Sequence, residues 1–173
     1  MKIFMTLGIA AVLAFGSSSA FAQSKANKDS ANFVKTAIQH NFAEIDAGKL
    51  AQEKGNSPAV KEYGAMLVKD HSEANGKAET VARQMNVEPP TSADVTHKAS
   101  YLKLKVLSGD TFDRTFMNDM VKDHEADVKK FQQQATKNDA AGNMAKEILP
   151  KLQTHLAEAK KVQQQLKQTT GSR

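Results

Sequence analysis

The sequence contains no cysteine, no tryptophan and only 4 prolines in 173 residues. The absence of cysteine excludes disulfides, so packing must supply the stability of the folded chain. The sequence also lacks a cysteine nucleophile, a glycine-rich phosphate loop and the G-x-S-x-G and H-E-x-x-H motifs. It therefore carries no recognisable enzyme signature. Its length suits one domain with a sizeable core.

Long apolar runs are also scarce, and the one that is present lies at the N-terminus. The run from Ile3 to Phe15 is too short to span a bilayer as a helix, and Ala20-Phe21-Ala22 is typical of an A-x-A cleavage site. We predict a signal peptide over residues 1–22, cleaved after Ala22, and a periplasmic or secreted mature chain without a transmembrane segment. The alternative is an uncleaved anchor. A lipoprotein is excluded because the chain has no cysteine.

Neither sign of charge dominates the sequence. The chain has 24 basic and 19 acidic residues and a formal net charge of +5, which becomes +4 when Lys2 leaves with the signal peptide. The basic residues are interspersed with acids at helical spacing, a pattern typical of a solvated surface. We therefore expect no nucleic-acid partner, while a weak association with an anionic envelope surface remains an alternative.

The apolar residues follow a helical pattern, and no stretch alternates with a period of two, so we expect no sheet. Four segments are predicted to be long helices: residues 31–54, 58–85, 111–136 and 140–168. Pro58 suits the first turn of the second helix, whereas Pro150 lies inside the fourth and should kink or divide it. Residues 23–30 are predicted to be a flexible N-terminal segment, and residues 169–173 a disordered tail.

A long connector, residues 87–109, separates the second and third predicted helices. Pro89-Pro90 interrupts the helical pattern, but apolar residues recur between Asp94 and Leu107 and indicate a short helix that closes one end of the fold. A connector of this length can cross the whole bundle, so the helices on either side of it can run parallel, as in ferritin-like folds. The sequence thus predicts an all-α, ferritin-like four-helix bundle over residues 31–168.

Four ionisable residues interrupt the apolar stripes of the long helices: Glu44, His71, His124 and His155. The residues seven positions to either side of each are apolar or small, which places each ionisable side chain on the buried face. Burying a polar group without a partner costs roughly 1–3 kcal/mol. We therefore expect the four side chains to satisfy one another, to hold water or to bind a ligand.

The four residues also lie at similar heights along their helices. The segment Leu67–His71 resembles Met120–His124, and each of these histidines is near the fourteenth residue of its predicted helix. At a rise of about 1.5 Å per residue both are near mid-height, as are Glu44 and His155. The sequence therefore predicts one polar layer across the core.

Two interpretations of this layer remain open. Neutral imidazoles and a carboxylate suit Fe, Zn, Mn or Cu, and three histidines with one glutamate can complete a tetrahedral shell around one ion. The alternative is a structural or pH-responsive network in a non-catalytic envelope or stress protein, with Glu44 accepting hydrogen bonds from the histidines. The spacing predicts burial and does not distinguish the two.

Aspartates near the histidines are candidates to support the layer. Asp70 and Asp123 each precede a histidine and cannot face it from the same helix. We expect them to orient a histidine of another helix or to pair with a lysine. Asp127 follows His124 by almost one turn and is predicted to be its hydrogen-bond partner.

Three further polar residues are predicted to lie outside the layer. His40 lies away from the centre of its stripe and is expected to be exposed or at an edge. His97 lies on the connector and is expected at the surface. Asp113 lies near the start of the third helix, where a negative charge interacts favourably with the helix dipole.

The sequence resembles a bacterial family described as a domain of unknown function and numbered 4142. The resemblance rests on these pieces: Phe33-Val34, Glu44-Ile45, Gly48–Ala51, Met66, Asp70-His71, Ser108-Gly109, Phe112-Asp113, Met120, His124, Leu149-Pro150, Leu152 and His155-Leu156. It implies a ferritin-like bundle in an exported protein and no established activity. A ferritin-like di-iron site uses two Glu-x-x-His motifs, and this chain has none, so a mononuclear or decayed site fits better.

Overall fold

The computed structural model describes residues 17–171, and side chains from residue 27 to 168. Helices are the only regular secondary structure among these residues: α1 (Ser17–Lys54), α2 (Pro58–Gln84), α3 (Val95–Lys105), α4 (Gly109–Ala135) and α5 (Ala140–Gly171). The predicted all-α class is thereby confirmed for the described part of the chain. The apolar run of the predicted signal peptide lies outside it. None of the described helices has the length and hydropathy needed to cross a membrane.

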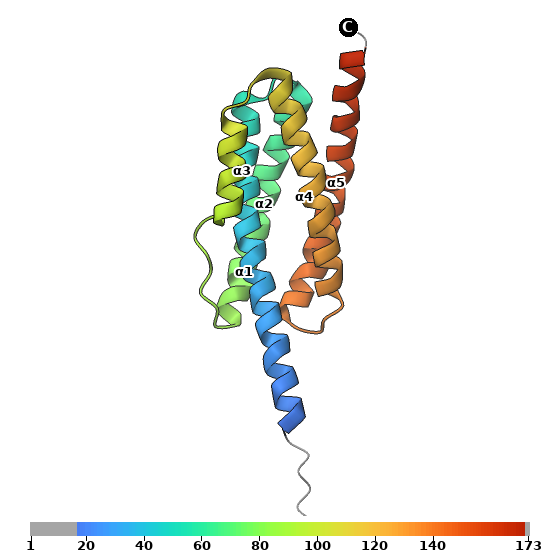
Figure 1. The fold of residues 1–173 in the computed structure, drawn as a ribbon. Helices are drawn as coiled ribbons and strands as arrows, with labels where there is room; N and C mark the ends of the chain where they lie inside the picture. Colours follow the sequence, from blue (N-terminus) through green and yellow to red (C-terminus); the bar gives the residue numbers. More distant parts are fainter. Residues whose placement is uncertain (1–16, 172–173) are drawn as a thin grey trace, which may run out of the picture.

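The four long helices pack side by side as two hairpins, α1 with α2 and α4 with α5, and α2 also packs against α5 (Figure 1). In Figure 1 both α2 and α4 run from the top of the molecule to the bottom, as the colours show. The long connector between them carries the chain back to the top. The helices on either side of it therefore run parallel, as its length predicts.

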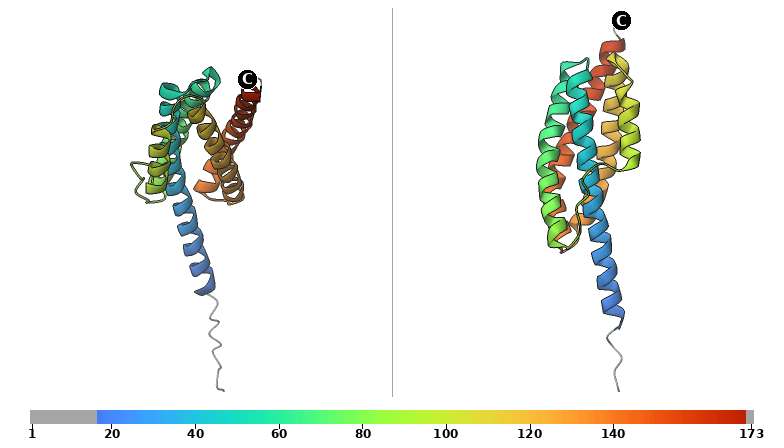
Figure 2. Two further views of the ribbon diagram at one scale, coloured as in Figure 1. Left: turned by 45° about the horizontal axis from the view of Figure 1, so that its top comes forward. Right: turned by 90° about the vertical axis from the view of Figure 1, so that its left-hand side faces the viewer.

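The short helix of the connector is present as α3, but the prediction that it closes one end of the fold is wrong. It lies lengthwise along α1 and touches α4 (Figures 1 and 2). Leu104 is buried and Tyr101 packs on the core, whereas Val95, Leu102 and Val106 are exposed. Because only a narrow face of α3 is apolar, the helix packs against the side of α1 and leaves its other faces exposed.

The first helix is longer than the sequence predicts. It begins at Ser17, well before Ala31, so the segment 23–30 that was predicted to be flexible is helical. Ser30 is buried: it donates a hydrogen bond of 2.6 Å to Asp139 and accepts one of 3.0 Å from Gln134. These polar contacts across the hairpins are invisible to a search for apolar periodicity. The predicted cleavage point after Ala22 lies within α1, whose N-terminal part projects below the other helices in Figure 1.

The last helix is also longer than expected. It continues through Pro150 without a break and ends at Gly171, beyond the predicted end at Gln168. Pro150 therefore does not divide the helix. Of the predicted disordered tail, residues 169–171 are helical, and residues 172–173 lie outside the described part.

Two apolar clusters form the core, one on each side of a polar layer. One cluster includes Leu67, Phe116 and Met120, and the other includes Ile38, Phe131 and Leu152. On each long helix a polar residue separates the members of the first cluster from those of the second: Glu44, His71, His124 and His155. The core thus places all four of these residues at its middle.

The hairpin of α1 and α2 depends on a close approach of two glycines. A Cβ atom added to Gly64 would lie 2.6 Å from the carbonyl oxygen of Gly48, and one added to Gly48 would lie 2.7 Å from that of Gly64. Both obstructing atoms belong to the backbone, so only a shift of a whole helix would relieve the clash. The glycines therefore set the spacing of α1 against α2, next to the polar layer.

Gly64→Ala should lower the free energy of unfolding by about 1–3 kcal/mol, because it overpacks this contact. Gly76 on the same helix is the matched control, since an added Cβ there meets nothing within 4 Å. Gly76→Ala should raise stability by up to about 1 kcal/mol through helix propensity. Urea unfolding of both variants checks the prediction, and equal effects would contradict it.

Asp113 has a more specific role than the predicted interaction with its helix dipole. It is buried, and its carboxylate accepts hydrogen bonds from the backbone nitrogens of Asn56 (2.9 Å) and Ser57 (2.7 Å). Ser57 precedes α2 but makes no capping hydrogen bond with its own side chain. The carboxylate from α4 therefore anchors the turn between α1 and α2.

Candidate metal centre

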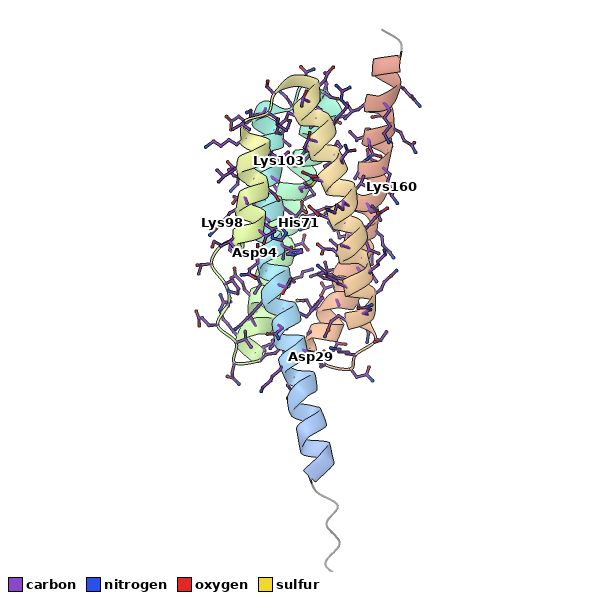
Figure 3. The ribbon with its side chains drawn as sticks, in the orientation of Figure 1. Asp29, His71, Asp94, Lys98, Lys103 and Lys160 are labelled. Atoms are coloured by element: carbon purple, nitrogen blue, oxygen red, sulfur yellow. The ribbon has the colours of Figure 1, made fainter. Side chains whose placement is uncertain are left out.

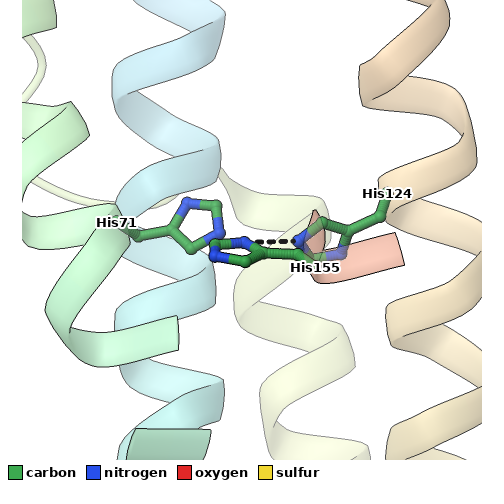
Figure 4. Close-up of side chains that lie close together, drawn as sticks. All are labelled: His71, His124 and His155. Atoms are coloured by element: carbon green, nitrogen blue, oxygen red, sulfur yellow. Dashed lines mark hydrogen bonds between the residues drawn. The ribbon is translucent and has the colours of Figure 1, made fainter. Parts of the chain in front are cut away.

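Three histidines from three helices meet at the middle of the core. His71 comes from α2, His124 from α4 and His155 from α5, and their side chains converge in Figure 4. The ring centroids are 5.7 Å apart for His71 and His124, 5.2 Å for His71 and His155, and 5.3 Å for His124 and His155. One nitrogen of each ring lies within 4.8 Å of the others, and each residue is at most 3% exposed. The structure thus brings these three predicted residues together.

Each imidazole uses its outer nitrogen to donate a hydrogen bond. His124 Nδ1 lies 3.0 Å from the Met120 carbonyl oxygen, and His155 Nε2 lies 3.0 Å from Asp70 Oδ2. His71 Nδ1 lies 2.9 Å from Asn41 Oδ1. All three partner atoms are acceptors, so the hydrogen of each neutral ring is on the outer nitrogen. The inner nitrogens then carry lone pairs.

The histidines are neutral at pH 7 because burial penalises their charged forms. Burial lowers the pKa of His71 well below its ordinary value, and repulsion from the protonated forms of His124 and His155 lowers it further. The pKa of His124 falls to about 4, chiefly through burial. Burial also lowers the pKa of His155, although the hydrogen bond to Asp70 opposes this effect.

The inner nitrogens consequently form an unsatisfied group. His124 Nε2 and His155 Nδ1 lie 3.3 Å apart, the contact drawn dashed in Figure 4. In neutral rings whose outer nitrogens hold the hydrogens, neither of these two atoms has one to donate, so they face each other with lone pairs. The buried His71 Nε2 has no hydrogen-bond partner. A proton or a cation between the rings would satisfy them.

Asp70 behaves as its position in the sequence predicts. It accepts the hydrogen bond of His155 on another helix, and its second oxygen lies 2.7 Å from Lys151 Nζ. Burial alone would raise its pKa, but the hydrogen bonds from Lys151 and His155 outweigh burial and hold the pKa below its ordinary value. Asp70 is therefore ionised and holds the His155 ring in one orientation and one tautomer.

The two other predicted aspartates lie on the side of α4 that faces α1 and α3. Asp127 contacts His40 at 3.2 Å and Lys130 at 3.5 Å, so the prediction that it pairs with His124 is wrong. The Met120 carbonyl takes that role because it lies one turn before His124 on the same helix. Asp123 lines a cavity between α1, α3 and α4, where burial and then the charges of Asp119 and Asp127 raise its pKa.

Glu44 lies between the same two apolar clusters as the histidines but does not belong to their cluster. It is 6% exposed, its Oε2 has no hydrogen-bond partner, and it lines the same cavity of about 220 Å³ as Asp123. Burial raises the pKa of Glu44 well above its ordinary value, and the charges of Asp123 and Asp127 add to this effect. The group of ligand atoms within 4.8 Å comprises the three histidines alone.

Asn41 is a part of the site that was not predicted from the sequence. It is 7% exposed, on α1, and accepts the hydrogen bond of His71. The sequence carried a signal for it, because an asparagine on an apolar stripe needs a partner as much as a histidine does.

The sequence matches the family described as "Domain of unknown function (DUF4142)" over residues 16–162. The chain belongs to this family. The family resemblance inferred from the sequence is thereby confirmed, and the matched region of this DUF4142 protein includes Glu44 and the three histidines. A search of curated proteins finds no match.

The fold of this DUF4142 protein is similar to a crystal structure described as a DUF305 fragment from Deinococcus radiodurans. The two share 15% sequence identity with a TM-score of 0.70, and the alignment covers 79% of this chain and 95% of that chain. At this identity the likeness concerns the fold alone.

Proposed function

We propose that this DUF4142 protein binds one transition-metal ion between His71, His124 and His155. The observation that carries the proposal is the direction of the lone pairs. Each neutral ring donates its hydrogen to an outer acceptor and leaves an inner nitrogen that is unsatisfied or faces another lone pair. Metal-ligating histidines are oriented in this way by carboxylates and backbone carbonyls.

The spacing of the inner nitrogens supports a tetrahedral ion. Two nitrogens bound to zinc at about 2.0–2.1 Å with a tetrahedral angle lie about 3.3–3.4 Å apart. The His124 and His155 nitrogens are 3.3 Å apart already, and the third nitrogen lies within 4.8 Å. At most a small inward shift of His71 therefore brings it into the shell, and Glu44 or a water is the group to complete it. A cation would also stabilise the ionised form of Glu44.

The donor set narrows the choice of ion. Three imidazoles suit Zn, Cu or Fe, and the chain has no cysteine thiolate, the ligand that would favour a softer ion. The missing Glu-x-x-His motifs favour one ion over a di-iron pair within a ferritin-like four-helix bundle. The parallel course of α2 and α4 supports that fold assignment.

Export to the periplasm is part of the proposal and rests on the N-terminal sequence. The short apolar run and the Ala20-Phe21-Ala22 site support cleavage after Ala22. Cleavage there would remove the start of α1 and leave every residue of the polar layer. The mass of the protein purified from its native host should correspond to a chain that begins at Gln23, and a full-length mass would contradict cleavage.

Titration with Zn²⁺, followed by calorimetry, tests the metal site. The untagged protein should bind one zinc ion in the core, and the double variant His71→Ala/His124→Ala should lose that binding. Met117→Ala is the matched control, because it opens a cavity on the same face of α4 without removing a ligand. Circular dichroism confirms that each variant is folded.

An unchanged number of zinc ions bound per chain, at unchanged affinity, in the folded double variant would reject the site. The layer would then be a structural network, in which His124 and His155 share a proton at 3.3 Å. That alternative also predicts that a single His→Leu substitution is tolerated or stabilising, since an apolar side chain of similar size replaces a poorly satisfied polar one.

A further inference from the structure

A second cluster of possible ligands lies outside the core, where α3 packs on α1. His40 belongs to α1, Asp94 is the residue before α3, and His97 is in the first turn of α3. One ligand atom from each lies within 4.8 Å of the others. All three are half-buried, with side chains 18% to 31% exposed, so solvent reaches them. Figure 3 shows Asp94 at the lower end of α3.

Carboxylates hold both imidazoles of this cluster in place. His40 Nδ1 lies 3.2 Å from Asp127, and His97 Nδ1 lies 2.9 Å from Asp94. Asp94 also accepts hydrogen bonds from the backbone nitrogens of Thr96 (2.8 Å) and His97 (3.0 Å), which cap α3. The two rings touch edge to face, with centroids 4.3 Å apart. His40 uses Nδ1 for its bond to Asp127, so Nε2 is the nitrogen that it can offer to a cation. At His97, a cation shared with Asp94 would take the place of the hydrogen between Nδ1 and the carboxylate.

We propose that His40, Asp94 and His97 form a second, outer site for a divalent transition-metal cation. Two imidazoles and one carboxylate are a recurrent donor set for such ions, and they leave coordination positions open for water. Asp119 and Asp123 line the adjoining cavity and Asp127 contacts His40, so three carboxylates of α4 favour a positive charge here, against Lys103 and Lys122 in the same cavity. Because the ligands are partly exposed, a cation bound here can exchange with solvent, in contrast to one in the enclosed core.

The outer site has a structural consequence of its own. Its ligands come from α1 on one side and from the start of α3 on the other, so a bound cation cross-links them. The contact between Asp94 and His97 is local to α3 and by itself explains only the helix cap. It does not explain why His40 lies against His97 with its ring held by Asp127. A shared cation accounts for that convergence, whether or not an ion occupies the core.

Titration with Co²⁺, followed by its visible absorption, tests the outer site because the spectrum reports each coordination environment. The background is the full-length His71→Ala/His124→Ala variant, which removes the core ligands, and it should still bind one cobalt ion. In that background Asp94→Asn and His97→Gln should each weaken this binding at least tenfold. Asn keeps the helix cap, so Asp94→Asn leaves α3 intact. Asp119→Asn is the matched control, because it removes the same charge beside the cluster without removing a ligand.

Proton NMR of the same titration locates the ion. Substoichiometric Co²⁺ should broaden the ring protons of His40 and His97 before those of His155. The proposal is overturned if the core variant binds no cobalt, or if Asp94→Asn and His97→Gln leave its affinity unchanged. It is also overturned if Asp119→Asn weakens binding as much as they do, since the attraction would then be a general effect of acidic charge. None of these outcomes alters the zinc test of the core.

Discussion

Lowering the pH from 7 to 5 should destabilise the metal-free protein by about 2 kcal/mol through His124 alone. Its pKa is about 4 in the folded chain against 6.5 as the ordinary value. Between these values the unfolded chain binds a proton that the folded chain refuses, so stability falls as the pH falls below 6.5. His71 and His155, whose pKa values are also lowered, act in the same direction.

Glu44 opposes this loss. Its pKa is raised well above 4.5 by burial, so above pH 4.5 the unfolded chain releases a proton that the folded chain keeps. The resulting penalty is present near neutral pH and disappears as the pH falls toward 4.5. Asp123, whose pKa is also raised, acts in the same direction as Glu44. The aspartates with lowered pKa values contribute only below about pH 4 and leave this window unchanged.

Urea unfolding of wild type and of Glu44→Gln at pH 7, 6 and 5 separates the effect of the histidines from that of Glu44. Wild type should lose stability toward pH 5, and Glu44→Gln should lose it more steeply because the opposing carboxyl is gone. A flat profile between pH 7 and 5 in both proteins would contradict the burial of three neutral histidines. A less steep profile in Glu44→Gln would contradict the raised pKa of Glu44.

Asp70→Ala should weaken zinc binding in the core by about 10–100-fold. Asp70 accepts the hydrogen bond of His155 Nε2 and so directs Nδ1 toward the other rings. Without this carboxylate, His155 can rotate or change tautomer, and its basicity falls. Calorimetric titration with Zn²⁺ measures the loss.

Lys151→Ala is the matched control for this substitution. It removes the 2.7 Å contact to the other oxygen of Asp70 and leaves the contact between Asp70 and His155 in place. It should change zinc affinity less than threefold, because exposed ion pairs contribute little. An equal loss in both variants would show that the charge pair, rather than the orientation of His155, supports the site.

Helical periodicity alone placed the three histidines in one layer. Each lies seven residues from apolar or small residues on its own helix, and the uniform rise of a helix sets their height. The role of Asp70 followed from the same geometry, because neighbours in sequence cannot face each other on a helix. These inferences needed only local rules, which is why they were accessible from the sequence.

The outer cluster of His40, Asp94 and His97 could not be predicted from such local rules. His40 and His97 meet because α3 lies along α1, and that position depends on the path of a connector without periodicity. Asp127 likewise lies close enough to His124 in sequence to suggest a pair, but it turns toward α1. The burial of Ser30, just before the predicted start of α1, depends on its polar contacts with α4 and the following turn. Each of these features requires knowledge of which helices are neighbours.

The location of a bound ion tests the central claim most directly. Crystals grown with Zn²⁺ and measured at the zinc absorption edge give an anomalous difference map that shows every zinc position. The proposed core site predicts a peak about 2.0–2.1 Å from His71 Nε2, His124 Nε2 and His155 Nδ1. A map from zinc-saturated crystals with no peak between these three rings would contradict the claim and leave the histidines as a structural layer.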